Sequence, residues 1–154
     1  LTTMVGVPLL YVHGNHDDKS NVKPPEGCIC IEDEIYEYEG VRFLGLGGSN
    51  RYKPGDNQYT QKEMTKRVKK LWWKLKRNKG FDVLVTHSPA KGLHDGEDIC
   101  HTGFDVFNRL IEQYRPKYFV HGHVHMSYGR QFVRLDKVGE TTVINAYEKY
   151  IVEI

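Results

Sequence analysis

The strongest constraint on the fold is a strand, helix, strand order in the second half of the chain. Residues 81–86 are predicted to form a strand, residues 103–115 an amphipathic helix stopped by Pro116, and residues 117–121 a second strand. Because a helical crossover joins parallel strands, the two strands should lie in one sheet. Parallel strands end at a common edge, where ligands bind. The sequence therefore predicts an α/β fold with a functional site beyond residues 86 and 121.

The remaining segments complete a mixed α/β architecture. Apolar residues at helical spacing predict a helix over residues 60–79, capped by Thr60 and ended by Gly80. The segment from Gly45 to Asn57 is interpreted as a flexible rim. Short apolar runs predict further strands, the last three of them antiparallel, at residues 8–12, 35–38, 41–46, 131–135, 141–145 and 150–154, with a turn at residues 137–140.

Metal-competent side chains follow three of the predicted strands. Asn15 follows the first apolar run, His87 follows residues 81–86, and His123 and His125 follow residues 117–121. A single histidine at a strand end is more often structural, but three histidines and Asn15 together at strand ends outweigh that interpretation. One amide oxygen and three imidazole nitrogens suit manganese, iron or zinc better than calcium or magnesium. We expect these four residues to bind divalent metal.

Three motifs together resemble those of the calcineurin-like metallophosphoesterases: Gly14-Asn15-His16-Asp17, then His87, then Gly122-His123-Val124-His125. The resemblance implies a four-layer αββα sandwich with mixed sheets, and two metal ions bridged by a carboxylate. It also implies that Asn15, His87 and His123 bind the second metal and His125 the first. By the same resemblance His16 is the catalytic histidine and Asp17 orients it.

The chemistry implied by the resemblance is phosphoester hydrolysis. Two metals about 3.5 to 4 Å apart generate a metal-bound hydroxide that attacks phosphorus in a phosphomonoester or phosphodiester. His16 beside the phosphate can protonate the leaving alkoxide. Residues 86–90, 92–98 and 141–145 are similar to those of a subgroup of small phosphodiesterases. In the loop after His87, His94, Asp95, Asp98 and His101 are either substrate contacts or an ordinary solvated polar loop.

Two ligand blocks of the family pattern are missing. The pattern begins with an Asp-x-His block and a Gly-Asp block after the first two strands, and no Asp-x-His occurs in this chain. The residues present supply three ligands for the second metal and one for the first, so they cannot complete a binuclear centre. We expect a single truncated domain, residues 1–154, that is the C-terminal portion of a longer enzyme and lacks its N-terminal strands. The alternatives are an inactive binding or scaffold module, or a nuclease of the same fold.

The expected partners follow from the open sheet and from one basic helix face. Missing strands would expose a sheet edge, which favours binding of the missing segment or homo-oligomerisation. The predicted helix carries nine basic residues against Glu63, a bias that suits nucleic acid but is more often a solvated face. Those residues are Lys62, Lys66, Arg67, Lys69, Lys70, Lys74, Lys76, Arg77 and Lys79.

Composition limits the location of the protein. A length of 154 residues with 39% hydrophobic residues fits one globular domain. No apolar run approaches the length of a membrane span, and the first residues lack the pattern of a signal peptide. Three cysteines, an odd number, argue against a disulfide framework. We therefore expect a cytoplasmic protein without membrane contact.

Overall fold

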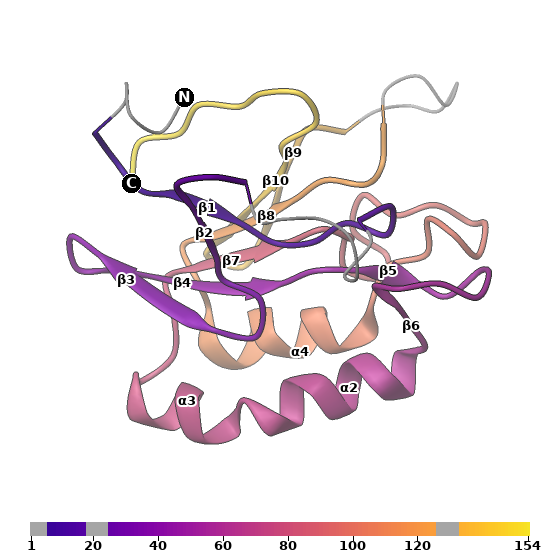
Figure 1. The fold of residues 1–154 in the computed structure, drawn as a ribbon, viewed down its shortest axis with the longest axis horizontal. Coiled ribbons are helices and arrows are strands. Elements are labelled where there is room, and N and C mark those ends of the chain that lie inside the picture. The colour runs from indigo at the N-terminus through magenta and orange to yellow at the C-terminus, as the bar shows by residue number, and fades with distance from the viewer. Residues whose placement is uncertain (1–5, 18–24, 126–132) are drawn as a thin grey trace.

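The computed structural model describes residues 6–17, 25–125 and 133–154. Its elements are short strands and three helices of up to ten residues (Figure 1). In chain order they are β1 (Leu9–Tyr11), β2 (Cys28–Cys30), β3 (Ile35–Tyr38), β4 (Val41–Leu46), β5 (Ser49–Asn50), β6 (Gln58–Tyr59), α2 (Gln61–Lys70), α3 (Trp72–Arg77), β7 (Val83–Thr86), α4 (Asp105–Tyr114), β8 (Tyr118–His121), β9 (Leu135–Val138) and β10 (Thr141–Asn145).

A six-stranded mixed sheet in the order β3-β4-β7-β8-β10-β9 forms the centre. The strands β4, β7, β8 and β10 run parallel, and β3 and β9 pair antiparallel at the two edges. The predicted strand, helix, strand unit is thus confirmed as β7, α4 and β8. The parallel strands end on the right-hand side of Figure 1.

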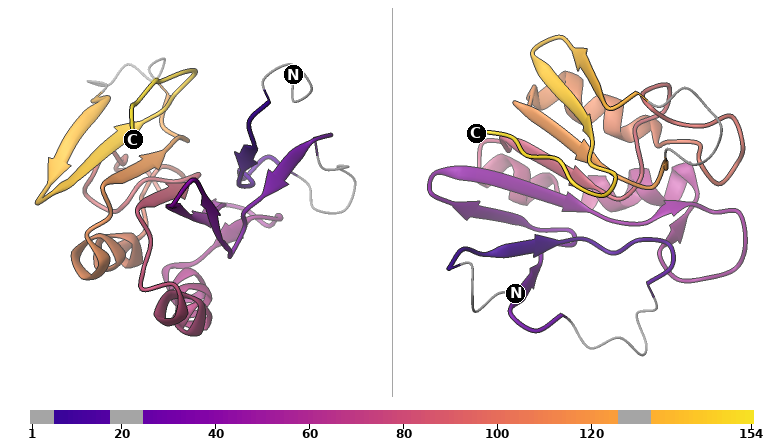
Figure 2. Two further views of the ribbon diagram at one scale, coloured as in Figure 1. Left: turned by 90° about the vertical axis from the view of Figure 1, so that its left-hand side faces the viewer. Right: turned by 90° about the horizontal axis from the view of Figure 1, so that it is seen from above.

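The three helices cover one face of this sheet, and the small parallel pair β1 and β2 lies on its other side (Figures 1 and 2). The core between helices and sheet is built from side chains that alternate along the strands and recur along the helices. Its fully buried members include Leu44, Leu84, Phe107, Phe119 and Val143. The hydrophobic periodicity of the sequence therefore predicted correctly the apolar side chains that the helices bury against this face of the sheet.

The helix predicted over residues 60–79 is divided in two at Leu71. Thr60 caps α2 in a capping box with Glu63, as the sequence indicates. Leu71 N donates to Val68 O at 3.0 Å, a tighter turn that separates α2 from α3. Trp72 and Trp73 on α3 are 49% and 70% exposed. Both tryptophans therefore face outward, beyond the core formed by the apolar stripe.

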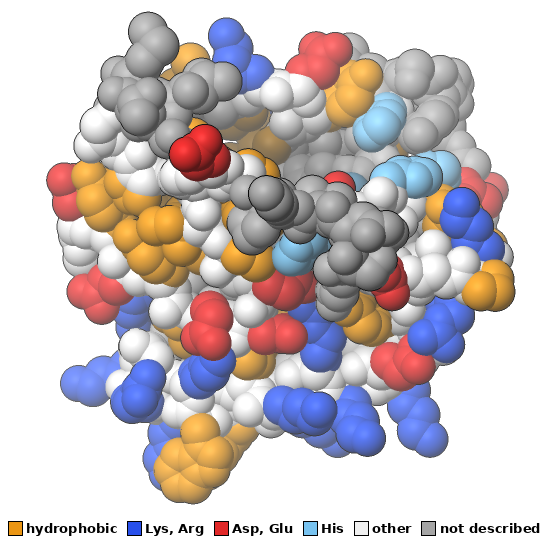
Figure 3. All heavy atoms as spheres, viewed as in Figure 1, with side chains coloured by type: hydrophobic (Ala, Val, Ile, Leu, Met, Phe, Trp, Pro, Cys, Tyr) orange, Lys and Arg blue, Asp and Glu red, His pale blue; other side chains and the backbone are white. Residues whose placement is uncertain are grey.

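The basic helix face is smaller than the sequence indicates. The Arg67 side chain is only 12% exposed because it turns inward to pair with Glu32 and Asp33. Lys74 pairs with Glu34, so its charge is also compensated. The other lysine and arginine side chains of α2 and α3 form the basic lower rim visible in Figure 3.

Three further expectations need correction. The predicted flexible rim, Gly45 to Asn57, contains β5, which pairs in parallel with β6 directly after the rim, and Asn57 is buried. β10 pairs antiparallel with β9, which confirms that expectation, and it also pairs in parallel with β8, which the sequence did not indicate. β9 begins at Leu135 and includes residues 137 and 138, which were assigned to a turn, while residues 131 and 132 lie outside the described residues. Residues 150–154 form no strand, since no sheet partner pairs with them in the described part of the chain.

Among the described helices, none has the length and apolar character needed to cross a membrane.

Candidate metal centre

Three segments that leave strand ends meet at one edge of the sheet. Gly122, directly after β8, donates its N–H to His87 O, directly after β7, at 3.0 Å. The segment after β1 reaches the same edge, because Gly48 N donates to His13 O at 2.8 Å. A Cβ at Gly47 would lie 2.4 Å from His13 O, so glycine permits this close approach. Histidine side chains gather at this end of the molecule (Figure 3).

Three of the predicted ligands converge at this edge. His87 Nε2 lies 2.8 Å from Asn15 Oδ1 and 3.0 Å from His123 Nδ1. Asn15 and His123 are buried, and His87 is half-buried. Residues separated by 72 and 36 positions in the chain are thus brought together by the sheet. The cluster formed by Asn15, His87 and His123 is called the triad below.

The hydrogen bonds around the triad fix which atoms face inward. The Asn15 amide nitrogen donates to Tyr52 OH at 3.2 Å, which leaves Oδ1 toward His87. His123 Nε2 lies 2.9 Å from Cys100 O, and because a carbonyl can only accept, Nε2 carries the proton. In neutral His123 the lone pair is then on Nδ1, the atom that faces His87. His123 also has a φ of 67°, an uncommon conformation for a non-glycine residue.

Burial keeps the triad imidazoles neutral. Desolvation lowers the pKa of His87 to about 4, with a further lowering from the neighbouring His123. The charge of Asp17 acts in the opposite direction, and the charges of His16 and His125 lower the pKa of His87 again. Desolvation also lowers the pKa of His123. Neutral imidazole is the form that binds metal. His87 Nε2 faces two acceptors and carries the ring proton in the metal-free protein, so on metal binding that proton would move to Nδ1 without a change in charge.

The triad fits a divalent metal ion. Donors bound about 2.1 Å from one ion at right angles lie about 3.0 Å from each other. The separations of 2.8 and 3.0 Å agree with that spacing. The hydrogen bond from His123 Nε2 to Cys100 O is the kind of outer contact that orients a ligating imidazole. The donor set of one oxygen and two nitrogens suits manganese, iron or zinc.

The other three predicted site residues lie around the triad without joining it. His16 and Asp17 are exposed, and Asp17 Oδ2 accepts a hydrogen bond from Gly14 N at 2.6 Å. Asp17 O accepts from Asn57 Nδ2 at 2.7 Å. His125 is exposed and its ring centroid lies 4.7 Å from that of Tyr147. The roles predicted for His16, Asp17 and His125 remain predictions.

Sequence reasoning missed the residues that orient the triad. Tyr52 and Cys100 contact Asn15 and His123 from loops far away in the chain, so no spacing pattern marks them. In the loop after β7, His94 Nδ1 lies 3.0 Å from His121 Nε2, beneath the sheet edge. Apart from the residue types, nothing in the sequence indicates that His94 and His121 lie together.

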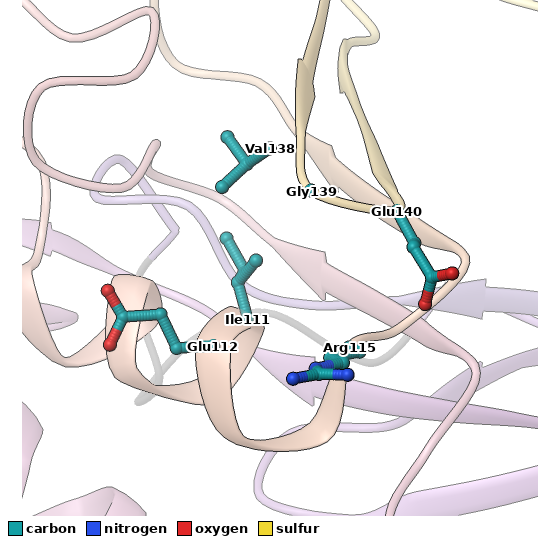
Figure 4. Close-up of a pocket in the computed structure, with 6 residues that line it drawn as sticks. All are labelled: Ile111, Glu112, Arg115, Val138, Gly139 and Glu140. Carbon is teal, nitrogen blue, oxygen red and sulfur yellow. The ribbon is translucent and has the colours of Figure 1, made fainter.

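Two hollows in the protein surface lie away from the triad. One is lined by Trp73, Lys74, Lys76 and Arg77 on α3. The other lies between the end of α4 and the turn from β9 to β10 (Figure 4), and it is lined by Ile111, Glu112, Arg115, Val138, Gly139 and Glu140. Neither lining includes a predicted site residue.

Substituting Gly14 tests how closely the triad is packed. A Cβ at Gly14 would lie 2.9 Å from His87 Cε1, so Gly14→Ala should displace the imidazole by a few tenths of an ångström. We expect Mn²⁺ affinity, measured by calorimetry, to fall about 10-fold, the size of effect seen when a ligand's outer support is lost. Gly122→Ala is the matched control because its Cβ would meet only His87 O, at 3.8 Å. Equal affinities of the two variants would contradict the prediction.

Acid should destabilise the metal-free protein. Folding lowers the pKa of His87 to about 4 and that of His121 to about 3, mainly by burial in both cases. Between those values and the ordinary pKa near 6.5 the unfolded chain binds more protons, so stability is complete above pH 6.5 and falls as the pH decreases. His87 alone accounts for about 2 kcal/mol between pH 7.5 and pH 5. Urea unfolding at both pH values measures this change, and constant or rising stability at pH 5 would refute it.

Comparisons with known proteins agree with the geometry. The family model for calcineurin-like phosphoesterases matches residues 1–127. The chain is 27% identical over 149 residues to the uncharacterized protein MJ1162 of Methanocaldococcus jannaschii, and this match covers 92% of the chain and 64% of that protein. It is also 27% identical over 149 residues to the UPF0046 protein C25E10.12 of Caenorhabditis elegans, covering 93% of the chain and 47% of that protein. The chain thus spans about half to two thirds of the length of these curated relatives.

Solved structures show the same fold. One crystal structure matches 79% of the chain and 47% of its own length, with a TM-score of 0.55 and 21% identity. The crystal structure of TT1561 of Thermus thermophilus matches 77% of the chain and 49% of its own length, with a TM-score of 0.50 and 14% identity. The mixed sheet, the three strand-end motifs and the family match over residues 1–127 together establish that the chain belongs to the calcineurin-like phosphoesterase family and has the metallophosphoesterase fold.

Proposed function

We propose that this chain supplies the second metal site and the catalytic histidine of a binuclear phosphoesterase, with phosphodiesters as the favoured substrates. The observation that carries the proposal is the convergence of three metal-competent atoms. Asn15 Oδ1 and His123 Nδ1 both lie within 3.0 Å of His87 Nε2. Family membership supports metal-dependent phosphoester hydrolysis. The three free cysteines are consistent with the cytoplasm as its location.

The metal pair, when bound, activates water and neutralises charge on the phosphoryl oxygens. The triad would hold the second ion of such a pair, and His125 would contribute to the first ion. The remaining ligands would come from the Asp-x-His and Gly-Asp blocks implied by the family pattern. In this proposal the chain acts together with a segment that carries both blocks.

His16 protonates the leaving oxygen. Its side chain is exposed beside the buried triad, where a phosphate held by the metals would be accessible to it. The hydrogen bond from Gly14 N to the Asp17 carboxylate fixes the turn that carries His16. Asp17 therefore positions His16 through the backbone.

Hydrolysis of a bis-aryl phosphodiester with added Mn²⁺ tests this function. Two proteins are assayed: this chain alone, and this chain fused after a family segment that carries the Asp-x-His and Gly-Asp blocks. We expect the fusion to be active, and His16→Ala to lower turnover about 100-fold or more while Mn²⁺ content is retained. Asn50→Ala, a change of another polar residue beside the same edge, serves as the control. A fusion that binds Mn²⁺ but hydrolyses no phosphoester would favour the binding or scaffold alternative.

We propose that the chain meets its partner at the edge of the small sheet formed by β1 and β2. β1 is half-buried along its length and, among the described strands, pairs only with β2. An unpaired strand edge next to the metal site can accept a further strand from the segment with the missing blocks or from a second copy. Either partner would extend the layer that carries Asn15.

A further inference from the structure

A second group of metal-competent side chains lies on the outer side of His123. Cys100 Sγ and a ring nitrogen each of His101 and His123 lie within 4.8 Å of one another. Cys100 Sγ is 3.9 Å from His123 Nε2, the nitrogen on the opposite edge of the ring from the triad. Zinc held tetrahedrally by sulfur at about 2.3 Å and nitrogen at about 2.0 Å separates its ligands by about 3.5 Å. The three side chains therefore need only small movements to hold one ion.

Asp98 orients His101 for such a role. His101 Nδ1 lies 2.8 and 2.9 Å from the two carboxylate oxygens of Asp98, and His101 N donates to the same carboxylate at 3.0 Å. A carboxylate on one imidazole nitrogen is the usual outer partner of a metal-binding histidine, because it fixes the tautomer and leaves Nε2 to the metal. The ring centroid of His101 lies 5.2 Å from that of His123, so the two rings face each other across the cluster.

We propose that Cys100, His101 and His123 form a thiophilic metal site for zinc, and that its occupation competes with metal in the triad and so inhibits hydrolysis; the inhibitory part rests on the proposed function. One thiolate and two imidazoles select zinc-like ions over manganese or magnesium. The fourth tetrahedral position is open to water, as in zinc sites with three protein ligands.

Competition follows from the single lone pair of a neutral imidazole. In the structure His123 Nε2 donates its proton to Cys100 O, and the Nδ1 lone pair faces the triad. Zinc on Nε2 breaks that hydrogen bond, the proton moves through solvent to Nδ1, and the Cys100 thiol releases its own proton to solvent. Protonated Nδ1 has no lone pair for metal in the triad. The two ions therefore exclude each other at His123.

Cadmium tests the site without relying on activity. A cadmium–thiolate bond has an ultraviolet charge-transfer absorption, and zinc should displace it. We expect Cys100→Ser to abolish the band and His101→Asn to weaken Cd²⁺ binding about 10-fold or more. The matched control is Cys28→Ser with Cys30→Ser, which changes the two other free thiols and should leave the band intact. A band that persists in Cys100→Ser, or that disappears in the control, would overturn the site.

Competition is tested separately from the site. Saturating Mn²⁺ should raise the apparent Kd for Cd²⁺ about 10-fold or more, and it should lose this effect in His87→Ala, which removes a triad ligand but none of the three proposed zinc ligands. If Mn²⁺ and Cd²⁺ bind independently in the unsubstituted chain, the competition is refuted. If His87→Ala leaves Mn²⁺ binding unchanged, the triad fails as a metal site while the cadmium band still reports on Cys100.

Discussion

His87→Ala should weaken Mn²⁺ binding to this chain by at least about 100-fold. His87 Nε2 is the central donor of the triad, 2.8 Å from Asn15 Oδ1 and 3.0 Å from His123 Nδ1. Loss of a residue that merely orients a ligand already costs about 10- to 100-fold in affinity, so loss of a central ligand should reach or exceed the upper value. A 100-fold change corresponds to about 2.7 kcal/mol of binding free energy.

The size of the effect depends on the buried, neutral state of His87. Because its pKa lies near 4, the imidazole needs no deprotonation to bind metal at neutral pH. His87→Ala removes that prepared donor and leaves Asn15 and His123 facing a gap. Two donors on their own retain weak affinity, since each is still held by its outer hydrogen bond to Tyr52 or Cys100.

Calorimetric titration with Mn²⁺ measures this prediction, and His94→Ala is the matched control. His94 is half-buried like His87 and lies on the same loop, but its ring nitrogen contacts His121 outside the triad. We expect its loss to leave Mn²⁺ affinity within about 3-fold of the original, below the effect of an outer ligand support. If His87→Ala binds Mn²⁺ as tightly as His94→Ala does, the triad is not the metal site.

The sequence predicted those parts of the fold that local patterns determine. The apolar stripe of residues 103–115 and Pro116 locate α4 between two parallel strands, as observed. The triad followed from residue types at strand ends, because the ends of parallel strands must meet. The parallel pairing of β10 with β8 could not be predicted in this way, since the alternation of side chains in a short strand does not show which strand lies beside it.

Interactions between distant loops left no pattern to detect. Arg67 was assigned to a solvated basic face because helical spacing places it beside lysines, yet it is buried against Glu32. The hydrogen bonds from Asn15 to Tyr52 and from His123 to Cys100 likewise depend on tertiary contacts. Helical periodicity shows which side of a helix a residue occupies, but not which carboxylate lies opposite.

Glu32→Ala should have the largest effect on stability, about 3 to 5 kcal/mol of unfolding free energy. The carboxylate pairs with Arg67, and each side chain is only 12% exposed. It also accepts hydrogen bonds from His13 N at 3.2 Å and Gly47 N at 3.1 Å. Removing it leaves two backbone donors without this acceptor, and the buried guanidinium keeps only the Asp33 carboxylate, which is 41% exposed, as its charge partner. Both losses are costly in a low-dielectric environment.

The same carboxylate joins the segment carrying Asn15 to the main sheet and to α2. His13 lies two residues before Asn15, Gly47 directly follows β4, and Arg67 belongs to α2. Once this connection is lost, Asn15 should be held less firmly, so we expect Mn²⁺ affinity to fall about 10-fold as well. Glu32→Gln keeps an oxygen acceptor but loses the charge, and it should lie between the original protein and Glu32→Ala in both measurements.

Urea unfolding of matched variants separates the buried pair from an exposed one. Lys74→Ala removes the partner of Glu34, whose side chain is 56% exposed, and should cost less than about 1 kcal/mol. The double variant Glu32→Ala with Arg67→Met should recover part of the loss seen for Glu32→Ala alone, because it also removes the buried guanidinium that would otherwise keep only the exposed Asp33 carboxylate as its partner. If Glu32→Ala destabilises the protein no more than Lys74→Ala, or if the double variant is the least stable of all, weakened charge compensation of Arg67 is not the cause.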